Sequence, residues 1–332
     1  MTASQSIGVI GGGAWGTALA SMLRRTDRDV LLWARNAAVV DEINREHLNS
    51  GYLPGEVLDP RLSATSDVAR VAARDVVLMV APAQQTRSVL TSLAPFLRPG
   101  TPVVLCSKGI EQTSGLLLSE VLAETLPDAT PAILSGPSFA HDVVRGLPAA
   151  LTIATTDDRL GQGLAEAIGY RNFRLYWSDD LVGVQLGGAV KNVLAIAAGI
   201  LDGRMLGASA HAALVTRGFA ELRRFGKMRG ARGDTLMGLS GLGDLLLTCG
   251  SPQSRNMSLG RALGQGRSLG DVLGARRSVS EGVYTAAVVT HIANAAGVAM
   301  PIATAVAGVM TGTTSVDVAI EDLLARPFKA ED

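Results

Sequence analysis

Two lysines stand out in this chain because lysine is otherwise almost absent from it. The sequence has four lysines, Lys108, Lys191, Lys227 and Lys329, whereas its other 26 basic residues are arginine. A desolvated lysine can give up its proton, which arginine cannot do in a protein. Lys108 lies two residues after an apolar run and Lys191 lies within one, so both are candidates for acid/base chemistry. Lys227 and Lys329 are expected at the surface, and the alternative for Lys191 is a side chain that extends to solvent.

Two adjacent glycines precede Lys191 by one helical turn. Gly187 and Gly188 would lie on the same face of a helix as Lys191. A glycine inside a helix costs about 1 kcal/mol relative to alanine. The pair therefore indicates that something approaches the helix closely at this point, either a ligand or another helix.

A glycine-rich turn near the start of the chain has the spacing of a phosphate-binding loop. Gly11, Gly13 and Gly16 follow the pattern G-x-G-x-x-G between an apolar run and an alanine-rich helical stretch. In such loops the first glycine allows a sharp turn, the second lets a pyrophosphate approach, and the third lets the helix pack on the strand. The N–H groups at the helix start then face the phosphates. The pattern also occurs in purely structural turns, but this context predicts dinucleotide binding.

The end of the second expected strand, residues 29–33, bears on which dinucleotide would bind. In NAD-specific sites an Asp or Glu normally closes this strand and binds the ribose 2′-OH. Here the nearby charged residue is Arg35. An arginine can pair with a 2′-phosphate, so the sequence permits NADP. The alternative is that Arg35 is only a solvated surface residue.

The elements that must position these residues alternate regularly in the first half. Strands are expected at residues 7–10, 29–33, 62–66, 76–80, 102–106, 132–134, 150–154 and 172–176, with helices at 38–48, 67–73, 85–97 and 115–125. This alternation predicts an α/β Rossmann domain with a doubly wound, mainly parallel sheet. Ligands bind such sheets beyond the carboxyl ends of the strands. That rule selects Ala81, Pro82, Lys108 and Gly136–Ser138, because each follows a strand closely.

From Leu181 onward strand-like runs give way to small-residue helical stretches. Helices are expected at residues 183–201, 210–225, 259–263, 285–296, 301–310 and 316–324. We therefore expect a sheet domain over residues 1–178 and an all-helical domain over residues 179–332. Ser178 or Asp179 is expected to cap the first long helix. The apolar stretches at 193–201 and 286–310 are expected to be buried helices and not membrane spans.

Composition argues against several other classes of protein. The chain has 332 residues, is 47% hydrophobic and 18% charged, and has a formal net charge of zero, so nothing suggests a nucleic-acid partner. Cys106 and Cys249 lie far apart and predict neither a disulfide nor a metal site, which fits a reducing compartment. The first residues do not have the pattern of a signal peptide.

Seven stretches along the chain match the motifs of a known family. They are residues 11–20 (GGGAWGTALA), 52–54 (YLP), 107–109 (SKG), 135–140 (SGPSFA), 183–192 (GVQLGGAVKN), 241–245 (GLGDL) and 254–256 (SRN). With these motifs the chain resembles, from Gly8 to about Leu324, the prokaryotic-type NAD(P)-dependent glycerol-3-phosphate dehydrogenases. The run at 187–192, part of the fifth stretch, is highly specific.

The resemblance implies a reaction and a setting for it. The reaction is the interconversion of dihydroxyacetone phosphate and sn-glycerol 3-phosphate by hydride transfer with NAD(P)H. The implied fold is a Rossmann domain followed by an all-helical domain, as in 6-phosphogluconate dehydrogenases. The resemblance further implies a cytoplasmic homodimer, without a nucleic-acid partner or a membrane span, that supplies glycerol 3-phosphate for phospholipid synthesis.

The resemblance also implies roles for individual residues. Lys191 would be the general acid/base, with Asp244 beside it. The substrate would be held by Lys108, Gly136, Ser138, Lys191, Asp244, Ser254, Arg255 and Asn256. The cofactor would be contacted by Gly11, Gly13, Ala14, Trp15, Gly16, Arg35, Lys108, Ala140, Arg255, Val279 and Glu281. Ala14 stands where the family often has serine, so only its backbone N–H could reach a phosphate.

The chemistry of the reaction agrees with these roles. Carbonyl reduction puts negative charge on oxygen as hydride arrives, so a proton donor is needed, and protonated Lys191 could be that donor. Its neutral form would be the base in the oxidation. Arg255 can form a bidentate pair with a phosphate, and Ser254 and Asn256 add polar groups beside it. Asp244 would repel a phosphate, so we expect it to pair with Lys191. The alternatives are a turn residue for Asp244 and a solvated arginine for Arg255.

Three other interpretations remain open at this point. A 3-hydroxyacid or 6-phosphogluconate-type dehydrogenase has the same domain order and often uses a lysine, but its substrate carries a carboxylate in place of the phosphomonoester. A redox-sensing protein that only binds NAD(P) needs no acid/base group. A histidine acid/base would be His141, since it alone of the four histidines follows the SGPSFA motif directly. The preference for NAD or NADP and the favoured direction also stay open.

Overall fold

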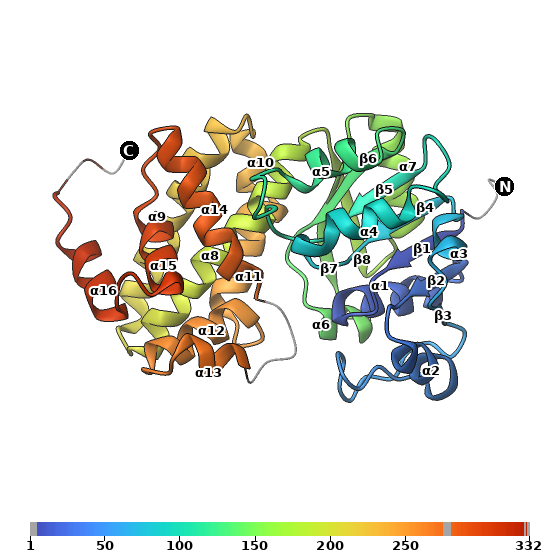
Figure 1. The fold of residues 1–332 in the computed structure, drawn as a ribbon, viewed down its shortest axis with the longest axis horizontal. Coiled ribbons are helices and arrows are strands. Elements are labelled where there is room, and N and C mark those ends of the chain that lie inside the picture. Colours follow the sequence, from blue (N-terminus) through green and yellow to red (C-terminus); the bar gives the residue numbers. More distant parts are fainter. Residues whose placement is uncertain (1–4, 275–279, 329, 331–332) are drawn as a thin grey trace.

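The computed structural model describes residues 5–274, 280–328 and 330, and it has two lobes, one built on a sheet and one made of helices (Figure 1). The strands are β1 (Ile7–Ile10), β2 (Val30–Trp33), β3 (Ser63–Thr65), β4 (Val76–Met79), β5 (Pro102–Leu105), β6 (Thr130–Ser135), β7 (Ala149–Ala154) and β8 (Phe173–Ser178). They form one sheet in the order β3-β2-β1-β4-β5-β6-β7-β8. Every predicted strand is present.

The sheet is mainly parallel, as predicted. Strands β1 to β6 run in one direction, whereas β7 pairs antiparallel with β6, with Ser135 opposite Thr152, and β8 runs parallel to β7. The chain order reverses at β1, which lies between β2 and β4. In doubly wound sheets this switch point marks the ligand crevice. The carboxyl ends of β1, β4, β5 and β6 therefore lie at one edge, and the residues that follow these strands gather there.

Helices cover both faces of the sheet. They are α1 (Ala14–Arg25), α2 (Ala37–Glu46), α3 (Val68–Ala72), α4 (Thr86–Leu93), α5 (Leu118–Thr125), α6 (Ala140–Val144) and α7 (Asp158–Ile168), with a 3-10 turn at Ala83–Gln85. Strand residues alternate between two buried clusters. One joins Val9 to residues of α1, α6 and α7, and the other joins Ile10 to residues of α3, α4 and α5. Helices α6 and α7 were not predicted.

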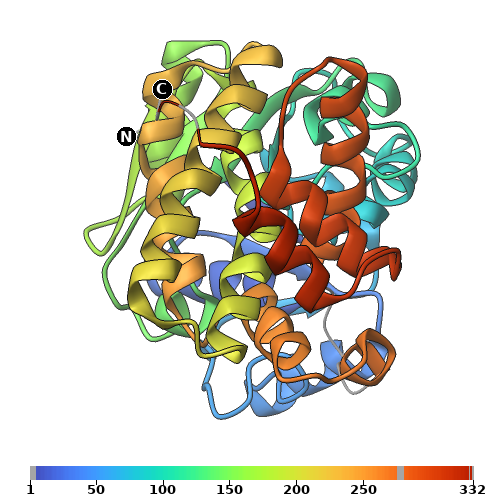
Figure 2. The same cartoon turned by 90° about the vertical axis from the view of Figure 1, so that its left-hand side faces the viewer.

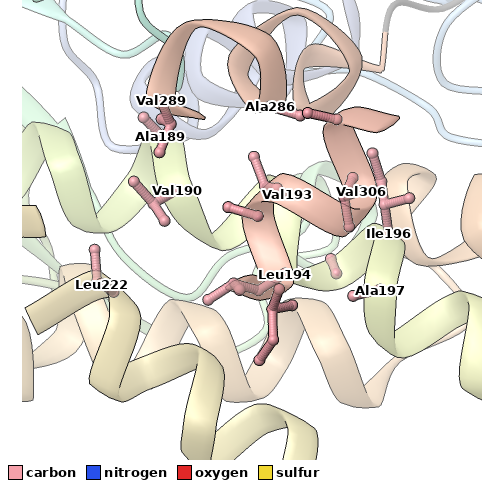
Figure 3. Packing of buried hydrophobic residues seen from close by; sticks show 14 of the residues in the cluster. Ala189, Val190, Val193, Leu194, Ile196, Ala197, Leu222, Ala286, Val289 and Val306 are labelled. Carbon is pink, nitrogen blue, oxygen red and sulfur yellow. The ribbon is translucent and has the colours of Figure 1, made fainter. Parts of the chain in front are cut away.

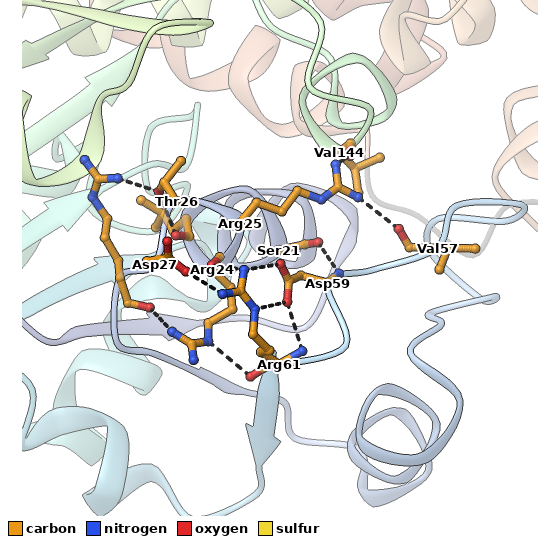
Figure 4. A network of polar contacts seen from close by, with 11 residues as sticks. Ser21, Arg24, Arg25, Thr26, Asp27, Val57, Asp59, Arg61 and Val144 are labelled. Carbon is orange, nitrogen blue, oxygen red and sulfur yellow. Dashed lines mark hydrogen bonds and ion pairs between the residues drawn. The ribbon is translucent and has the colours of Figure 1, made fainter.

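A polar network ties the loop that follows α2 to the far end of α1 (Figure 4). Ser21 accepts a hydrogen bond from Asp59 N at 2.9 Å, and Arg25 donates to Val57 O at 3.1 Å. Arg61 pairs with Asp59 at 2.9 Å and thereby holds the pKa of that carboxyl below its usual range.

The regular secondary structure of the second lobe is helical throughout its described residues, and Figure 2 shows this lobe facing the viewer. The helices are α8 (Leu181–Gly203), α9 (Gly207–Met228), α10 (Gly233–Met237), a π turn η2 (Leu239–Gly243), α11 (Asp244–Gly250), α12 (Arg255–Gly264), α13 (Leu269–Gly274), α14 (Glu281–Ala295), α15 (Pro301–Thr311) and α16 (Val316–Leu324). The core surrounds α8: its Val193 and Leu194 belong to one buried cluster with Leu222 of α9, Val289 of α14 and Val306 of α15 (Figure 3).

Helix α8 connects the two lobes. Its cap is Asp180, whose Oδ1 accepts from Gly183 N at 2.7 Å, so the prediction of Ser178 or Asp179 was wrong. Asp180 lies three residues before the free N–H of Gly183, which is the spacing that capping needs. Near its start, Val184 packs in a cluster with sheet residues. In the described residues α8 is the one helix long and apolar enough to cross a membrane, but 94% of its apolar window is buried inside the protein.

Candidate active site

The turn between β1 and α1 has the geometry that a dinucleotide requires. Gly11 has a φ of +128°, which a residue with a side chain rarely adopts. A Cβ on Gly16 would lie 2.0 Å from Gly11 O, whereas a Cβ on Gly13 would meet nothing within 4 Å. The space in front of Gly13 is therefore open, and no side chain caps the first N–H groups of α1. The three glycines occupy the three structural situations that their spacing predicts.

The other candidate cofactor residues of the sheet lobe surround this turn. Ala14 and Trp15 form the first turn of α1 and are half-buried. Arg35 is exposed just beyond β2. Ala140 begins α6 and packs in the same cluster as Ala14. Val279 lies outside the described residues.

A buried carboxylate joins the two lysines. Lys191 of α8 donates to Asp244 Oδ1, and Lys108 after β5 donates to Asp244 Oδ2 at 2.6 Å. Lys191 also donates to Thr248 Oγ1 at 2.7 Å, and Lys108 to Gly136 O at 3.0 Å. Each ammonium has three N–H groups, so one remains on each for a further acceptor. The cluster carries one net positive charge, which suits an oxygen that becomes negative.

Burial also changes the proton affinity of Lys191. Lys191 is 6% exposed and Asp244 is fully buried. Desolvation lowers the pKa of Lys191 from 10.5 to about 8; Asp244 opposes this change and Lys108 adds to it. An acid/base group works best when its pKa is close to the pH of the reaction. The alternatives of a surface lysine at 191 and a plain turn residue at 244 are therefore wrong.

The glycines that precede Lys191 accommodate other parts of the protein. A Cβ on Gly187 would lie 2.5 Å from Ser240 O of the π turn, and one on Gly188 would lie 2.7 Å from Ser135 Oγ and 3.2 Å from Lys108 Cγ. The close approach indicated by the sequence is thus made by η2 on one side and by the end of the sheet on the other. Both contacts bring groups of the lysine cluster to α8.

Two polar residues of the site were missed from the sequence. Thr248 lies one turn after Asp244 on α11 and accepts from Lys191; the i, i+4 spacing was a usable signal. Asn192 donates to Lys108 O at 3.1 Å and accepts from Asn256 at 2.9 Å. Asn256 in turn accepts from Gly282 N at 3.2 Å. This amide chain links the sheet edge to α12 and α14.

The start of α12 holds the candidate phosphate-binding residues. Ser254 caps the helix by accepting from Met257 N at 3.2 Å, so its hydroxyl already has a structural task. The Arg255 side chain is exposed. Partial desolvation of its guanidinium lowers the pKa of Arg255, and the charge of Glu281 opposes that change. Glu281 Oε1 accepts from Ala83 N at 3.0 Å, whereas its buried Oε2 has no partner among the described residues. Burial raises the pKa of Glu281.

The remaining candidates lie beside the sheet. Ser138 donates to the same Gly136 carbonyl that binds Lys108. His141, the other candidate acid/base, pairs with Glu56 at 3.0 Å, and no hydrogen bond joins it to the described residues of the lysine cluster. No three His, Cys, Asp or Glu side chains of the described residues lie together as metal ligands would.

Comparison with known proteins decides between the dehydrogenase interpretations. A family model described as NAD-dependent glycerol-3-phosphate dehydrogenase N-terminus matches residues 6–161, and its C-terminus counterpart matches residues 180–321. The chain belongs to this family. The resemblance identified from the sequence motifs is confirmed, and the 3-hydroxyacid and 6-phosphogluconate assignments are wrong.

Individual members of the glycerol-3-phosphate dehydrogenase family match over the full length. A protein of Parvibaculum lavamentivorans named glycerol-3-phosphate dehydrogenase [NAD(P)+] is 56% identical over 99% of both chains. One of a Bradyrhizobium species with the same name is 55% identical over 100% of both. The crystal structure of glycerol-3-phosphate dehydrogenase from Coxiella burnetii is 37% identical, covers 97% of this chain and 99% of its own, and superposes with a TM-score of 0.93.

Proposed function

We propose that this protein is an NAD(P)-dependent oxidoreductase that interconverts dihydroxyacetone phosphate and sn-glycerol 3-phosphate. The observation that carries the proposal is the buried Lys191–Asp244–Lys108 cluster at the ligand edge of the sheet. A protein that only binds the dinucleotide has no need for a lysine whose pKa is lowered to about 8. Membership in the family supports the same conclusion.

The residues present fit a nicotinamide dinucleotide. Gly11, Gly13 and Gly16 form an open cradle at the start of α1, where N–H groups and the helix dipole favour a pyrophosphate. Ala14 would contribute its backbone N–H. Further cofactor contacts are proposed for Trp15, Arg35, Lys108, Ala140, Arg255, Val279 and Glu281. When bound, the nicotinamide supplies or accepts the hydride.

The chain's own groups handle the proton and the charge. In the reduction, protonated Lys191 gives a proton to the carbonyl oxygen of the substrate, and in the oxidation neutral Lys191 removes it. Asp244 holds both ammonium groups in place, and Lys108 adds a second N–H for the oxygen. Arg255 and the N–H groups at the start of α12 would bind the phosphate, with Asn256, Gly136 and Ser138 nearby and the Ser254 hydroxyl retained as the helix cap.

The wider assignments follow from family membership. We infer that residues 1–178 bind the cofactor and that residues 179–332 supply the acid/base and bind the phosphate. A cytoplasmic homodimer that provides glycerol 3-phosphate for phospholipid synthesis is the setting we propose. Light scattering of the purified protein tests the dimer, which a monomer mass would contradict.

A direct assay tests the proposed reaction. Purified protein should oxidise NADPH or NADH in the presence of dihydroxyacetone phosphate and should form sn-glycerol 3-phosphate. Dihydroxyacetone is the matched control, because it has the same carbonyl without the phosphate, and it should react far more slowly. Turnover of a 3-oxo acid in place of dihydroxyacetone phosphate would contradict the assignment.

The pH dependence should follow Lys191. Since its pKa is lowered to about 8, kcat/KM for the reduction should be level below pH 8 and should fall above it, about tenfold per pH unit, as the proton is lost. For the oxidation, kcat/KM should instead rise with pH up to about pH 8 and stay level above it. Steady-state rates in both directions between pH 6 and 10 measure this. A reduction rate that rises through this range would rule out Lys191 as the proton donor.

Arg35 should decide the preference between the two dinucleotides. It is exposed beyond β2, where a 2′-phosphate would lie. Arg35→Asp should raise KM for NADPH by about tenfold or more, since it replaces an ion pair with a repulsion, and should leave KM for NADH within about threefold. Arg45→Asp, a change of the same kind at an exposed position on α2, is the control. Equal changes in KM for NADPH and NADH would show that Arg35 does not bind the 2′-phosphate.

A further inference from the structure

We propose that the π turn η2 is a positioning device that places Asp244 between Lys191 and Lys108. The inference rests on the proposed role of Lys191 as acid/base. The turn spans Leu239–Gly243 and runs directly into Asp244, the first residue of α11. Gly243 N donates to Gly238 O at 3.1 Å, and Asp244 N donates to Leu239 O. These i to i−5 hydrogen bonds make the turn just before Asp244 one residue longer than a turn of α-helix.

Such a turn is rare and needs tertiary support. π turns occur mostly as single turns, frequently at functional sites. Here the support comes from close backbone packing on both sides. A Cβ on Gly241 would lie 1.9 Å from Leu236 O of α10, and a Cβ on Gly187 of α8 would lie 2.5 Å from Ser240 O. Both obstacles are backbone atoms, which cannot move aside as the end of a flexible side chain can.

The contact between Gly187 and Ser240 fixes the relative positions of Lys191 and Asp244. Gly187 precedes Lys191 by four residues, one turn of α8, and Ser240 precedes Asp244 by the same number. Docking of η2 at Gly187 therefore sets the distance between the backbones that carry the amine and the carboxylate. On the next residue of α8, Gly188 leaves room for the side chain of Lys108. The adjacent glycines thus bring Asp244 and Lys108 to α8 from two directions.

The hydrogen bonds of Asp244 tolerate little displacement of its carboxylate. One oxygen serves Lys191 and the other serves Lys108 at 2.6 Å. A shift of about 1 Å would break one of these bonds, and displacements of that size can cost about 100-fold in rate. Because Asp244 raises the pKa of Lys191, the same shift would also lower that pKa.

Gly241→Ala tests the proposal, with Gly250→Ala as the matched control. Gly250 ends α11, and a Cβ there would meet nothing within 4 Å. In Gly241→Ala we expect kcat for dihydroxyacetone phosphate reduction to fall by at least about tenfold. The decrease of kcat/KM with rising pH, which begins near pH 8 in the wild type, should begin at least about half a pH unit lower. The Kd for NADPH, measured by calorimetry, should stay within about twofold. Gly250→Ala should match the wild type in all three measurements.

Gly187→Ala is a second variant, on the α8 side of the contact with η2. In this variant, too, kcat/KM for the reduction should begin to fall at a lower pH than in the wild type. If Gly241→Ala does not fold, the pH limb of Gly187→Ala decides. An unmoved limb in a folded variant, with or without a lower kcat, overturns the proposal, because a merely structural role would not involve the pKa of Lys191. Absence of dihydroxyacetone phosphate reduction in the wild type would instead overturn the proposed function.

Discussion

Replacing Lys191 with methionine is expected to lower kcat for dihydroxyacetone phosphate reduction by about 10²- to 10⁴-fold, the range that general acid/base groups contribute. Methionine matches the apolar stem of lysine without its ammonium and suits the buried position on α8, so the fold should persist. The Kd for NADPH, measured by calorimetry, should remain within about threefold, because the cradle at the start of α1 is untouched.

The control for this variant is Lys227→Met. Lys227 is exposed on α9, and its replacement should leave kcat unchanged within about twofold. If Lys191→Met retained a tenth or more of the wild-type kcat, Lys191 would not be the proton donor. If kcat and cofactor affinity fell together, the loss would reflect damage to the site in general and would argue against a role specific to the chemistry.

Asp244→Asn should affect both catalysis and stability. Asparagine has the same shape but no charge, so the two ammonium groups at Lys191 and Lys108 lose their shared partner. Breaking a buried ion pair on one side costs about 3–5 kcal/mol. The pKa of Lys191 should fall below about 8, because the group that raises it is gone. We expect a loss of at least about 100-fold in kcat for the reduction at pH 7.5.

Two measurements separate these effects. Denaturant unfolding gives the stability loss, and a pH profile of the remaining activity gives the new pKa, whose limb should lie at lower pH than in the wild type. Asp322→Asn, which removes an exposed carboxylate from α16, should change neither. A pH limb in Asp244→Asn that moved upward would contradict the geometry, because it would mean that Asp244 disfavours the charged lysine.

Much of the sheet lobe could be predicted because its central strands are short, rich in branched apolar residues and buried on both faces. Every run such as Val76–Met79 appears as a strand within one or two residues of its predicted limits. Helix α7 was missed because Gly161 and Gly163 weaken its helical pattern, although Asp157 caps it. The direction of β7 could not be predicted, since alternation of side chains is the same in parallel and antiparallel pairs.

The site was predictable where a residue type is itself unusual. Lys108 and Lys191 were recognisable because the chain uses arginine almost everywhere else. The pairing of Asp244 with Lys191 was expected and is present. The second contact of Asp244, with Lys108, was not predicted, since a contact across 136 residues leaves no periodic signal. The π turn has no sequence pattern that distinguishes it from an ordinary Gly-Leu-Gly turn. It exists because tertiary packing on Gly187 compensates for a backbone arrangement that is rare in isolated segments.

The continuity of α8 limits how the two lobes can move. The helix starts among sheet residues at Val184 and reaches Lys191 two turns later without a break. A flexible linker would let the lobes swing apart, but bending a continuous helix breaks its i to i−4 hydrogen bonds unless a proline or bulge relieves it. The joint is therefore stiff. The contacts of Lys191 and Lys108 with Asp244 are made without any ligand, so the charges that we propose for the reacting oxygen are in place before the substrate arrives.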